Sequence, residues 1–263
     1  MGEALGTFTL VFFGCGIIAI DLLTGAGFQH WEIGLVWGTA LAVGISFATG
    51  LSGAHLNPAI TLALAIWRKQ SGFKSTLMYV LSQLAGAVIA ATLLYSLLSG
   101  AVGEFEAVHG LKRGTPGSEL STMMFGEYYP NPALTGQAKR VLAGTSTGEA
   151  LLAESIGTAF LAFVVFAVSA RRRAPVALAP VAIGTTLAII ISVLAPITQA
   201  GLNPARDFGP RLVSYFAGWG ATAIPGPGGG FWIYIVGPLL GALLGGGLFE
   251  LFFKPGDRPG NTN

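Results

Sequence analysis

Charge is scarce in this chain. Only 10% of its 263 residues are Asp, Glu, Lys or Arg, whereas a typical soluble domain has roughly 25%. The formal net charge of +2 is too small to indicate a nucleic-acid partner. The lone cysteine, Cys15, excludes a disulfide within the chain, and the three histidines have no metal-ligand spacing. The sequence therefore predicts no metal site and no cofactor.

Apolar residues take the place of charge. They make up 52% of the chain, and the mean hydropathy is +0.68. Six stretches of about twenty residues are long enough to cross a lipid bilayer. They cover residues 3–20, 33–51, 77–98, 151–170, 176–194 and 231–253. All are rich in Gly and Ala, which lets membrane helices approach closely. The first stretch lacks the basic start of a signal peptide, so we expect it in the mature protein.

The triplet Asn-Pro-Ala occurs twice. Its copies are Asn57, Pro58 and Ala59, and Asn203, Pro204 and Ala205. Asn is a favoured helix N-cap and Pro is favoured at the first helical position, so each triplet predicts a helix start. The apolar run after the first copy covers only about two turns, too short to cross a bilayer. We therefore expect two half-helices. Irregular backbone leading into such a helix is tolerated in a membrane only beside a water-filled path or packed protein.

The two halves of the chain repeat each other. The pattern Glu-x-x-Gly-Thr occurs at residues 3–7 and again at 154–158. The pattern Leu-x-Gly-Ala occurs at residues 84–87 and again at 239–242. Each half, about residues 1–100 and 148–254, contains an odd number of spans, so the second copy is inverted. The sequence thus predicts an all-α membrane protein, one domain over residues 1–263. It has six transmembrane helices and two half-helices whose starts meet near the midplane.

Basic residues collect in the short connections between spans. They are Arg68, Lys69, Lys74, Arg171, Arg172, Arg173, Lys254 and Arg258. All fall on one side, and basic residues mark the cytoplasmic side, so we expect both termini in the cytoplasm of a cell-membrane protein. The segment from about 101 to 147 is then external. Its basic residues do not contradict this orientation, because long loops follow the rule poorly.

The two half-helix starts predict a path for neutral molecules. Each start carries roughly half a positive charge and unpaired N–H donors. Two starts facing one point oppose a cation or hydronium but can hold a neutral solute. Each asparagine is expected to cap its own helix through its oxygen and leave its NH2 free. We expect a ladder of acceptor carbonyls at Gly53, Ala54, His55, Gln199, Ala200 and Gly201.

Arg206 follows the second triplet at membrane depth, where an arginine costs roughly 2.5–3.5 kcal/mol. Such a residue is expected to face an aqueous path, where its charge repels cations and its donors hold a hydroxyl group or water. A single Asn-Pro-Ala would indicate only a capped helix. Two copies in an inverted repeat, one of them followed by Arg, favour a channel.

Residues 53–59 and 203–206 closely resemble the double signature of the major intrinsic protein family of aquaporins and glycerol facilitators, and the likeness covers essentially the whole chain. It implies an aquaporin-like fold and a passive channel. It also implies a homotetramer in which every subunit has its own pore. Glu3 and Glu154 match the family's buried glutamates, which accept hydrogen bonds from the loop backbones; a proton relay is the alternative role.

The same resemblance implies a constriction formed by four side chains. They are Trp37, Ile191, Ala200 and Arg206. Trp37 matches the glycerol-facilitator pattern, as do Asp207 and Arg211 after the second triplet. Ile191 instead stands where glycerol facilitators usually have Gly and water-selective members have His, and Ala200 stands where glycerol facilitators usually have Phe. We expect glycerol and water to pass, with glycerol slower than in a typical facilitator because Ile191 is bulkier than Gly.

Other functions remain compatible with the sequence. A water-selective aquaporin would carry little glycerol. An ion-coupled secondary transporter also uses inverted repeats and broken helices, although the intramembrane carboxylates here lie near helix ends. A junction-forming or structural member of the fold would conduct nothing. No Ser/His, Cys/His or metal constellation lies at a plausible depth, so we expect the chain not to be an enzyme.

Overall fold

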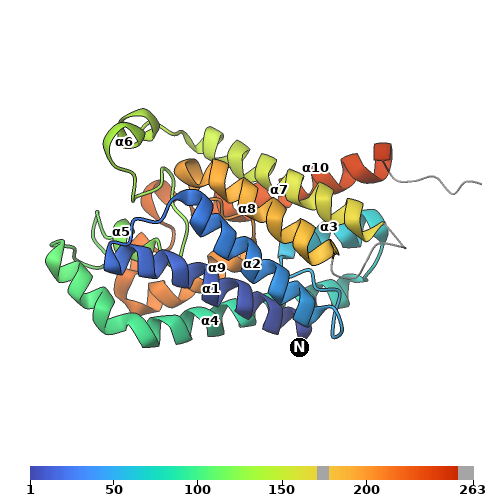
Figure 1. The fold of residues 1–263 in the computed structure, drawn as a ribbon, viewed down its shortest axis with the longest axis horizontal. Coiled ribbons are helices and arrows are strands. Elements are labelled where there is room, and N and C mark those ends of the chain that lie inside the picture. Colours follow the sequence, from blue (N-terminus) through green and yellow to red (C-terminus); the bar gives the residue numbers. More distant parts are fainter. Residues whose placement is uncertain (171–177, 254–263) are drawn as a thin grey trace, which may run out of the picture.

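The computed structural model describes residues 1–170 and 178–253, and over these ranges it contains helices, turns and loops but no strand. Figure 1 shows the long helices running side by side along the longest axis. The short helices α5 (Glu119–Thr122) and α6 (Gly136–Leu142) lie at one end, which we name the loop end. The N-terminus lies toward the other, the terminal end. Several residues used above for orientation or span limits lie outside the described ranges: Arg171, Arg172, Arg173, Val176, Lys254 and Arg258.

Six apolar helical stretches are long enough to cross a membrane, as predicted. They are α1 (Gly2–Thr24), α2 (His30–Ala48), α4 (Phe73–Val108), α7 (Thr147–Ser169), α8 (Leu178–Thr198) and Pro227–Phe253, which contains η3 (Pro227–Trp232), α10 (Ile233–Leu248) and η4 (Phe249–Phe253). The shorter α3 (Pro58–Arg68) and α9 (Pro204–Ser214) have 11 residues each. At 1.5 Å per residue such a helix covers roughly half of a bilayer core. The predicted all-α fold with six spans and two half-helices is confirmed.

The structure corrects two predicted helix limits. α4 continues to Val108 instead of ending at residue 98. The helix continues past the end of the apolar run through Glu104 and Glu106, and Arg113 Nε donates to the Glu106 carboxylate at 2.8 Å. α7 begins at Thr147 instead of residue 151, since a capping box forms at its start. The segment between α4 and α7 therefore covers residues 109–146.

Glycines let the spans pack backbone against backbone, as the Gly-rich sequence predicts. A Cβ atom at Gly86 of α4 would lie 2.2 Å from the Ala4 carbonyl oxygen, and one at Gly241 of α10 would lie 2.2 Å from that of Ser155. No side chain fits at such distances. Ala4 and Ser155 directly follow the repeated glutamates, so the matched sequence patterns of the two halves also make matched contacts.

Part of the connecting segment folds into the bundle at the loop end. Residues 121–128 are all buried, including the large side chains of Met124 and Phe125. Phe125 packs edge-on against Tyr95 of α4, with ring centroids 6.0 Å apart. This buried stretch brings polar groups from the connecting segment close to the start of α9.

Candidate functional site

A cavity of about 260 Å³ lies inside the bundle and contacts both half-helix starts. Toward the terminal end its lining includes Thr49, Gln70 and Ser169. Most residues singled out from the sequence line it: Gly53, Ala54, His55 and Asn57, the four residues Trp37, Ile191, Ala200 and Arg206, and Gly201 and Asn203. Gln199 is not among the lining residues. Apolar side chains such as Leu41 and Ile183 form much of the remaining wall, so the cavity has a polar and an apolar side.

The two asparagines cap their own helices, as predicted. Asn57 Oδ1 accepts the N–H of Ala59 at 2.8 Å, and Asn203 Oδ1 accepts that of Ala205 at 3.0 Å. The prediction that both NH2 groups are free is wrong. Asn57 Nδ2 donates to the Leu202 carbonyl at 2.9 Å, and Asn203 Nδ2 donates to the Leu56 carbonyl at 2.8 Å. These reciprocal bonds join the half-helix starts, and each amide keeps one hydrogen for the cavity.

Glu3 holds the loop before α3. Its Oε1 accepts the N–H of His55 at 3.1 Å, and its Oε2 accepts that of Leu56 at 2.8 Å. Ala54 and Leu56 both have a φ of 51°, a left-handed conformation that costs energy in residues other than glycine. The buried carboxylate compensates for this strain. Within a trans peptide the C=O points opposite to the N–H, so the carbonyls of Ala54 and His55, whose peptides donate to Glu3, point away from that carboxylate.

Glu154 does the same for the loop before α9. Its Oε1 accepts the N–H of Gly201 at 3.0 Å and its Oε2 accepts that of Leu202 at 2.7 Å. Ala200 and Leu202 have φ values of 59° and 56°. Gln199, also left-handed at 62°, turns its side chain toward the connecting segment, where its Oε1 accepts the N–H of Tyr128 at 2.9 Å. Gln199 thus anchors this segment and does not line the cavity.

The four residues of the predicted constriction come together on the cavity wall. Each is only 3–4% exposed. The Arg206 guanidinium carbon lies 4.1 Å from the centroid of the Trp37 ring, a distance that allows a cation–π interaction. Arg206 Nη1 also donates to the Phe125 carbonyl at 3.3 Å. The guanidinium is therefore fixed against Trp37 and the connecting segment.

Glu127 is the partner of Arg206 that the sequence did not reveal. Its carboxylate forms an ion pair with Arg206 Nη2, and the residue is 1% exposed. Burial raises the pKa of Glu127 to about 8, although the charge of Arg206 opposes the shift. The connecting segment has no periodic pattern that would direct a carboxylate to this place. Its position beside Arg206 depends on contacts distant in sequence.

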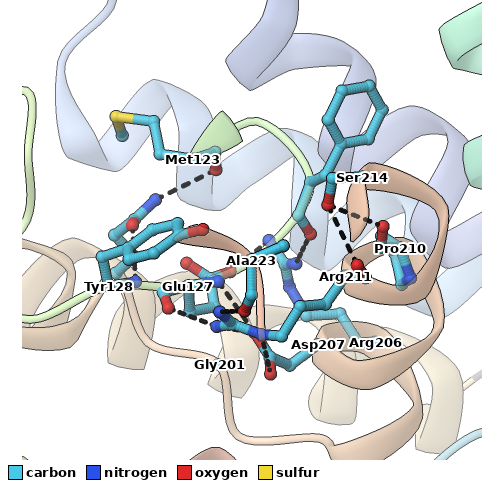
Figure 2. A network of polar contacts seen from close by, with 12 residues as sticks. Met123, Glu127, Tyr128, Gly201, Arg206, Asp207, Pro210, Arg211, Ser214 and Ala223 are labelled. Carbon is cyan, nitrogen blue, oxygen red and sulfur yellow. Dashed lines mark hydrogen bonds and ion pairs between the residues drawn. The ribbon is translucent and has the colours of Figure 1, made fainter. Parts of the chain in front are cut away.

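Asp207 and Arg211, one turn apart on α9, fix the backbone of Glu127. Arg211 Nε and Nη2 donate to the two carboxylate oxygens of Asp207 at 2.9 and 2.8 Å. Asp207 Oδ1 also accepts the N–H of Glu127 at 2.7 Å, and Arg211 Nη2 donates to its carbonyl. Figure 2 shows this network, in which Arg211 also reaches the carbonyl of Ala223. Two buried residues that do not line the cavity thus position the partner of Arg206.

Residues 1–170 and 178–253 contain no group of three or more His, Cys, Asp or Glu side chains arranged to hold a metal ion. His55 instead lies with Nδ1 3.2 Å from Thr61 Oγ1 and its ring 4.9 Å from that of Tyr79. The polar side chains on the cavity wall include the amides of Asn57 and Asn203, the His55 ring and the paired guanidinium of Arg206. Such groups bind and orient a neutral solute.

Comparison with known proteins identifies this arrangement. The family described as "Major intrinsic protein" matches residues 1–249. The glycerol uptake facilitator protein of Pseudomonas aeruginosa is 40% identical over 259 residues, covering 95% of this chain and 87% of that protein. The facilitator of Escherichia coli K12 is 36% identical over 251 residues, covering 93% and 84%. The X-ray structure of the aquaglyceroporin from Plasmodium falciparum has a TM-score of 0.80 and 26% identity, covering 95% and 94%. The chain therefore belongs to the major intrinsic protein family, a family of membrane channels and not of enzymes.

Proposed function

We propose that this protein is a passive channel for glycerol and water that excludes ions and protons. The observation that carries the proposal is the cavity that joins Trp37, Ile191, Ala200 and Arg206 to both cross-linked half-helix starts. The names of the relatives, glycerol uptake facilitator and aquaglyceroporin, support glycerol as the solute.

The two sides of the cavity suit a polyol. The C–H groups of glycerol lie against Trp37, Ile191 and the apolar wall. Its hydroxyl groups donate to the carbonyls before the half-helices and accept from Arg206 and the asparagine amides. A solute that exchanges water for these partners loses little hydrogen bonding, whereas an ion loses its hydration and meets two positive helix starts.

A water channel with little glycerol flux is the second candidate, and one observation favours it. Arg206 is held against Trp37, and Ile191 adds a branched side chain to the same constriction. The opening is therefore narrower than it would be with a Gly at position 191. Water needs only a single-file path, but glycerol needs the wider one. The ratio of the two permeabilities distinguishes the candidates.

Orientation and assembly are part of the proposal. We place the loop end outside the cell and both termini in the cytoplasm, because Arg68, Lys69 and Lys74 follow the half-helix at the terminal end. The protein is proposed to lie in the cell membrane as a homotetramer. Many large apolar side chains on the outside of the single chain, such as Phe13 and Val193 at 55% and 64% exposure, are then covered by lipid or by neighbouring subunits.

Stopped-flow light scattering on proteoliposomes tests the proposal. An inward glycerol gradient should give reswelling much faster than in empty liposomes, and an impermeant osmolyte should give faster shrinkage. Glycerol reswelling equal to that of empty liposomes, with fast shrinkage retained, would select the water channel. Dependence of glycerol flux on a proton or sodium gradient would instead indicate a secondary transporter.

A further inference from the structure

A second cavity, of about 220 Å³, lies at the loop end beside the pore cavity, and no residue lines both. The connecting segment forms one side of it through Tyr129 and Pro132, and η3 forms another through Phe231. Its deep wall contains Glu127 and Tyr234. Glu127 is thus shared: its carboxylate contacts Arg206 at the pore and also borders this second space. We name this space the side cavity.

Two buried side chains on the wall of the side cavity have polar atoms without a hydrogen-bond partner among the described residues. Among the described residues, the hydroxyl group of Tyr234 has no hydrogen-bond partner although the residue is 1% exposed. Neither carboxylate oxygen of Glu127 accepts a hydrogen bond there beyond the contact with Arg206. Buried polar groups are nearly always satisfied by protein, water or a ligand. The side cavity is therefore equipped to receive an occupant with hydroxyl groups.

The missing hydrogen-bond partner is particular to Tyr234, as a comparison of the two halves of the chain shows. Tyr79 and Tyr234 occupy the same place relative to Gly86 and Gly241, the two glycines with matched packing contacts. In the first half, the Tyr79 hydroxyl accepts the N–H of Gly53 at 3.0 Å. In the second half, no backbone N–H of a described residue donates to the Tyr234 hydroxyl group. Tyr79 thus holds a loop in the first half, whereas its counterpart Tyr234 in the second half has a hydroxyl group without a partner among the described residues.

The chemistry of the walls favours a small neutral polyol over an ion. The rings of Tyr129 and Phe231 suit C–H groups, and Tyr234 with Glu127 suits hydroxyl groups. The guanidinium of Arg211, also in the wall, is neutralised by Asp207, as Glu127 is by Arg206. These paired charges cancel, and the one further carboxylate among the described lining residues, Glu119, accepts the N–H of Gly117 at 2.6 Å. The volume exceeds that of a few waters, since one water needs only about 10–15 Å³ on this measure.

We propose that the side cavity is a second polyol-binding site, in which hydroxyl groups bind Tyr234 and the free oxygen of Glu127. A hydroxyl group that donates to Glu127 competes with Arg206 for the same carboxylate. Occupancy therefore loosens the hold on Arg206 and changes conduction through the constriction without blocking it. Binding at this site does not depend on the proposed channel function; only the effect on flux rests on it.

Saturation-transfer NMR on the detergent-purified channel, with xylitol as the probe, tests binding directly. Tyr234→Phe removes only the free hydroxyl group. Tyr79→Phe removes the matching hydroxyl group in the other half and is the control for losing a buried tyrosine oxygen. Pro132→Phe is a second variant, which fills the side cavity with a ring. Size-exclusion profiles and thermal unfolding establish that all three fold.

Xylitol should show saturation transfer with the wild type and with Tyr79→Phe. Its affinity should fall by about two- to tenfold in Tyr234→Phe, the effect of one net hydrogen bond. In Pro132→Phe the transfer should fall further, to the signal that the pore cavity alone gives. Equal transfer in all variants, or none in the wild type, would overturn the proposal. At one xylitol concentration, equal on both sides, water permeability should then change in the wild type and change less in Tyr234→Phe. Binding without any such change would overturn the coupling to Arg206.

Discussion

Gly14 on α1 is the position where one added methyl group tests the constriction most directly. A Cβ atom at Gly14 would lie 2.2, 2.3 and 2.4 Å from three ring atoms of Trp37, whereas ordinary contacts begin at 3.4 Å. Cβ atoms essentially never lie within 3.0 Å of another heavy atom, so in Gly14→Ala the Trp37 ring or the α1 backbone must shift. The Arg206 guanidinium lies 4.1 Å from the ring centroid on the cavity side. We expect the displacement to press Trp37 toward Arg206 and narrow the opening.

The size of the effect follows from the packing. Overfilling a packed interior typically costs about 1–3 kcal/mol. If the ring relieves this strain by moving into the opening, an increase of about 1.4 kcal/mol in the barrier for glycerol lowers its flux about tenfold. Water is smaller and is less affected. The glycerol-to-water permeability ratio should therefore fall in Gly14→Ala.

Stopped-flow light scattering on proteoliposomes measures both permeabilities, and α1 offers a matched control. At Gly16 an added Cβ atom would meet only Leu94 Cδ1, at 3.9 Å, so Gly16→Ala should keep the wild-type ratio. Both variants make the same chemical change two positions apart on one helix. A wild-type ratio in folded Gly14→Ala would refute the placement of Trp37 in the constriction.

Three further substitutions test the constriction and its supports. Arg206→Ala removes the donors and the charge at the opening, so uptake of glycerol and of larger polyols should rise in the same assay. Glu127 should gain a proton as the pH falls through about 8, which changes its pair with Arg206 from neutral to net positive. The freed guanidinium then binds water more tightly, so water permeability should fall over that pH step, and Glu127→Gln should stay low at every pH. Glu154→Gln puts an NH2 donor in place of one carboxylate oxygen, which now accepts the N–H of Gly201 or Leu202. The free energy of unfolding, followed by thermal unfolding, should fall by about 1–3 kcal/mol.

The fold was predictable because its signals are local. Hydropathy over about twenty residues identifies a span, and the pair Asn-Pro identifies a helix start from two adjacent residues. Asn57 and Asn203 accordingly begin α3 and α9 in the structure. The limits of α4 were less predictable. Its last turns contain Glu104 and Glu106, which lower the local hydropathy, and the ion pair of Glu106 with Arg113 cannot be read from the hydropathy of the helix.

The surroundings of Arg206 were not predictable for a related reason. Its contact with Glu127 joins α9 to an irregular segment, and neither partner carries a local sign of the other. The prediction that the two asparagines have free NH2 groups was wrong for the same reason. Left-handed backbone at Leu56 and Leu202 turns each carbonyl toward the opposite asparagine, and only the assembled pair of loops shows this.

The pairing of Arg206 changes how ion exclusion must work in the proposed channel. An isolated guanidinium would repel cations by its full charge, which is the role expected from the sequence. The structure pairs Arg206 with Glu127, and Arg211 with Asp207, so above the pKa of Glu127, about 8, the four buried charges sum to zero. A neutral constriction sorts solutes by size and hydrogen bonding. Repulsion of cations then depends mainly on the two half-helix starts. Among the described residues no carboxylate lines the cavity to cancel their partial charges, and Glu3 and Glu154 bind the N–H groups of the preceding loops.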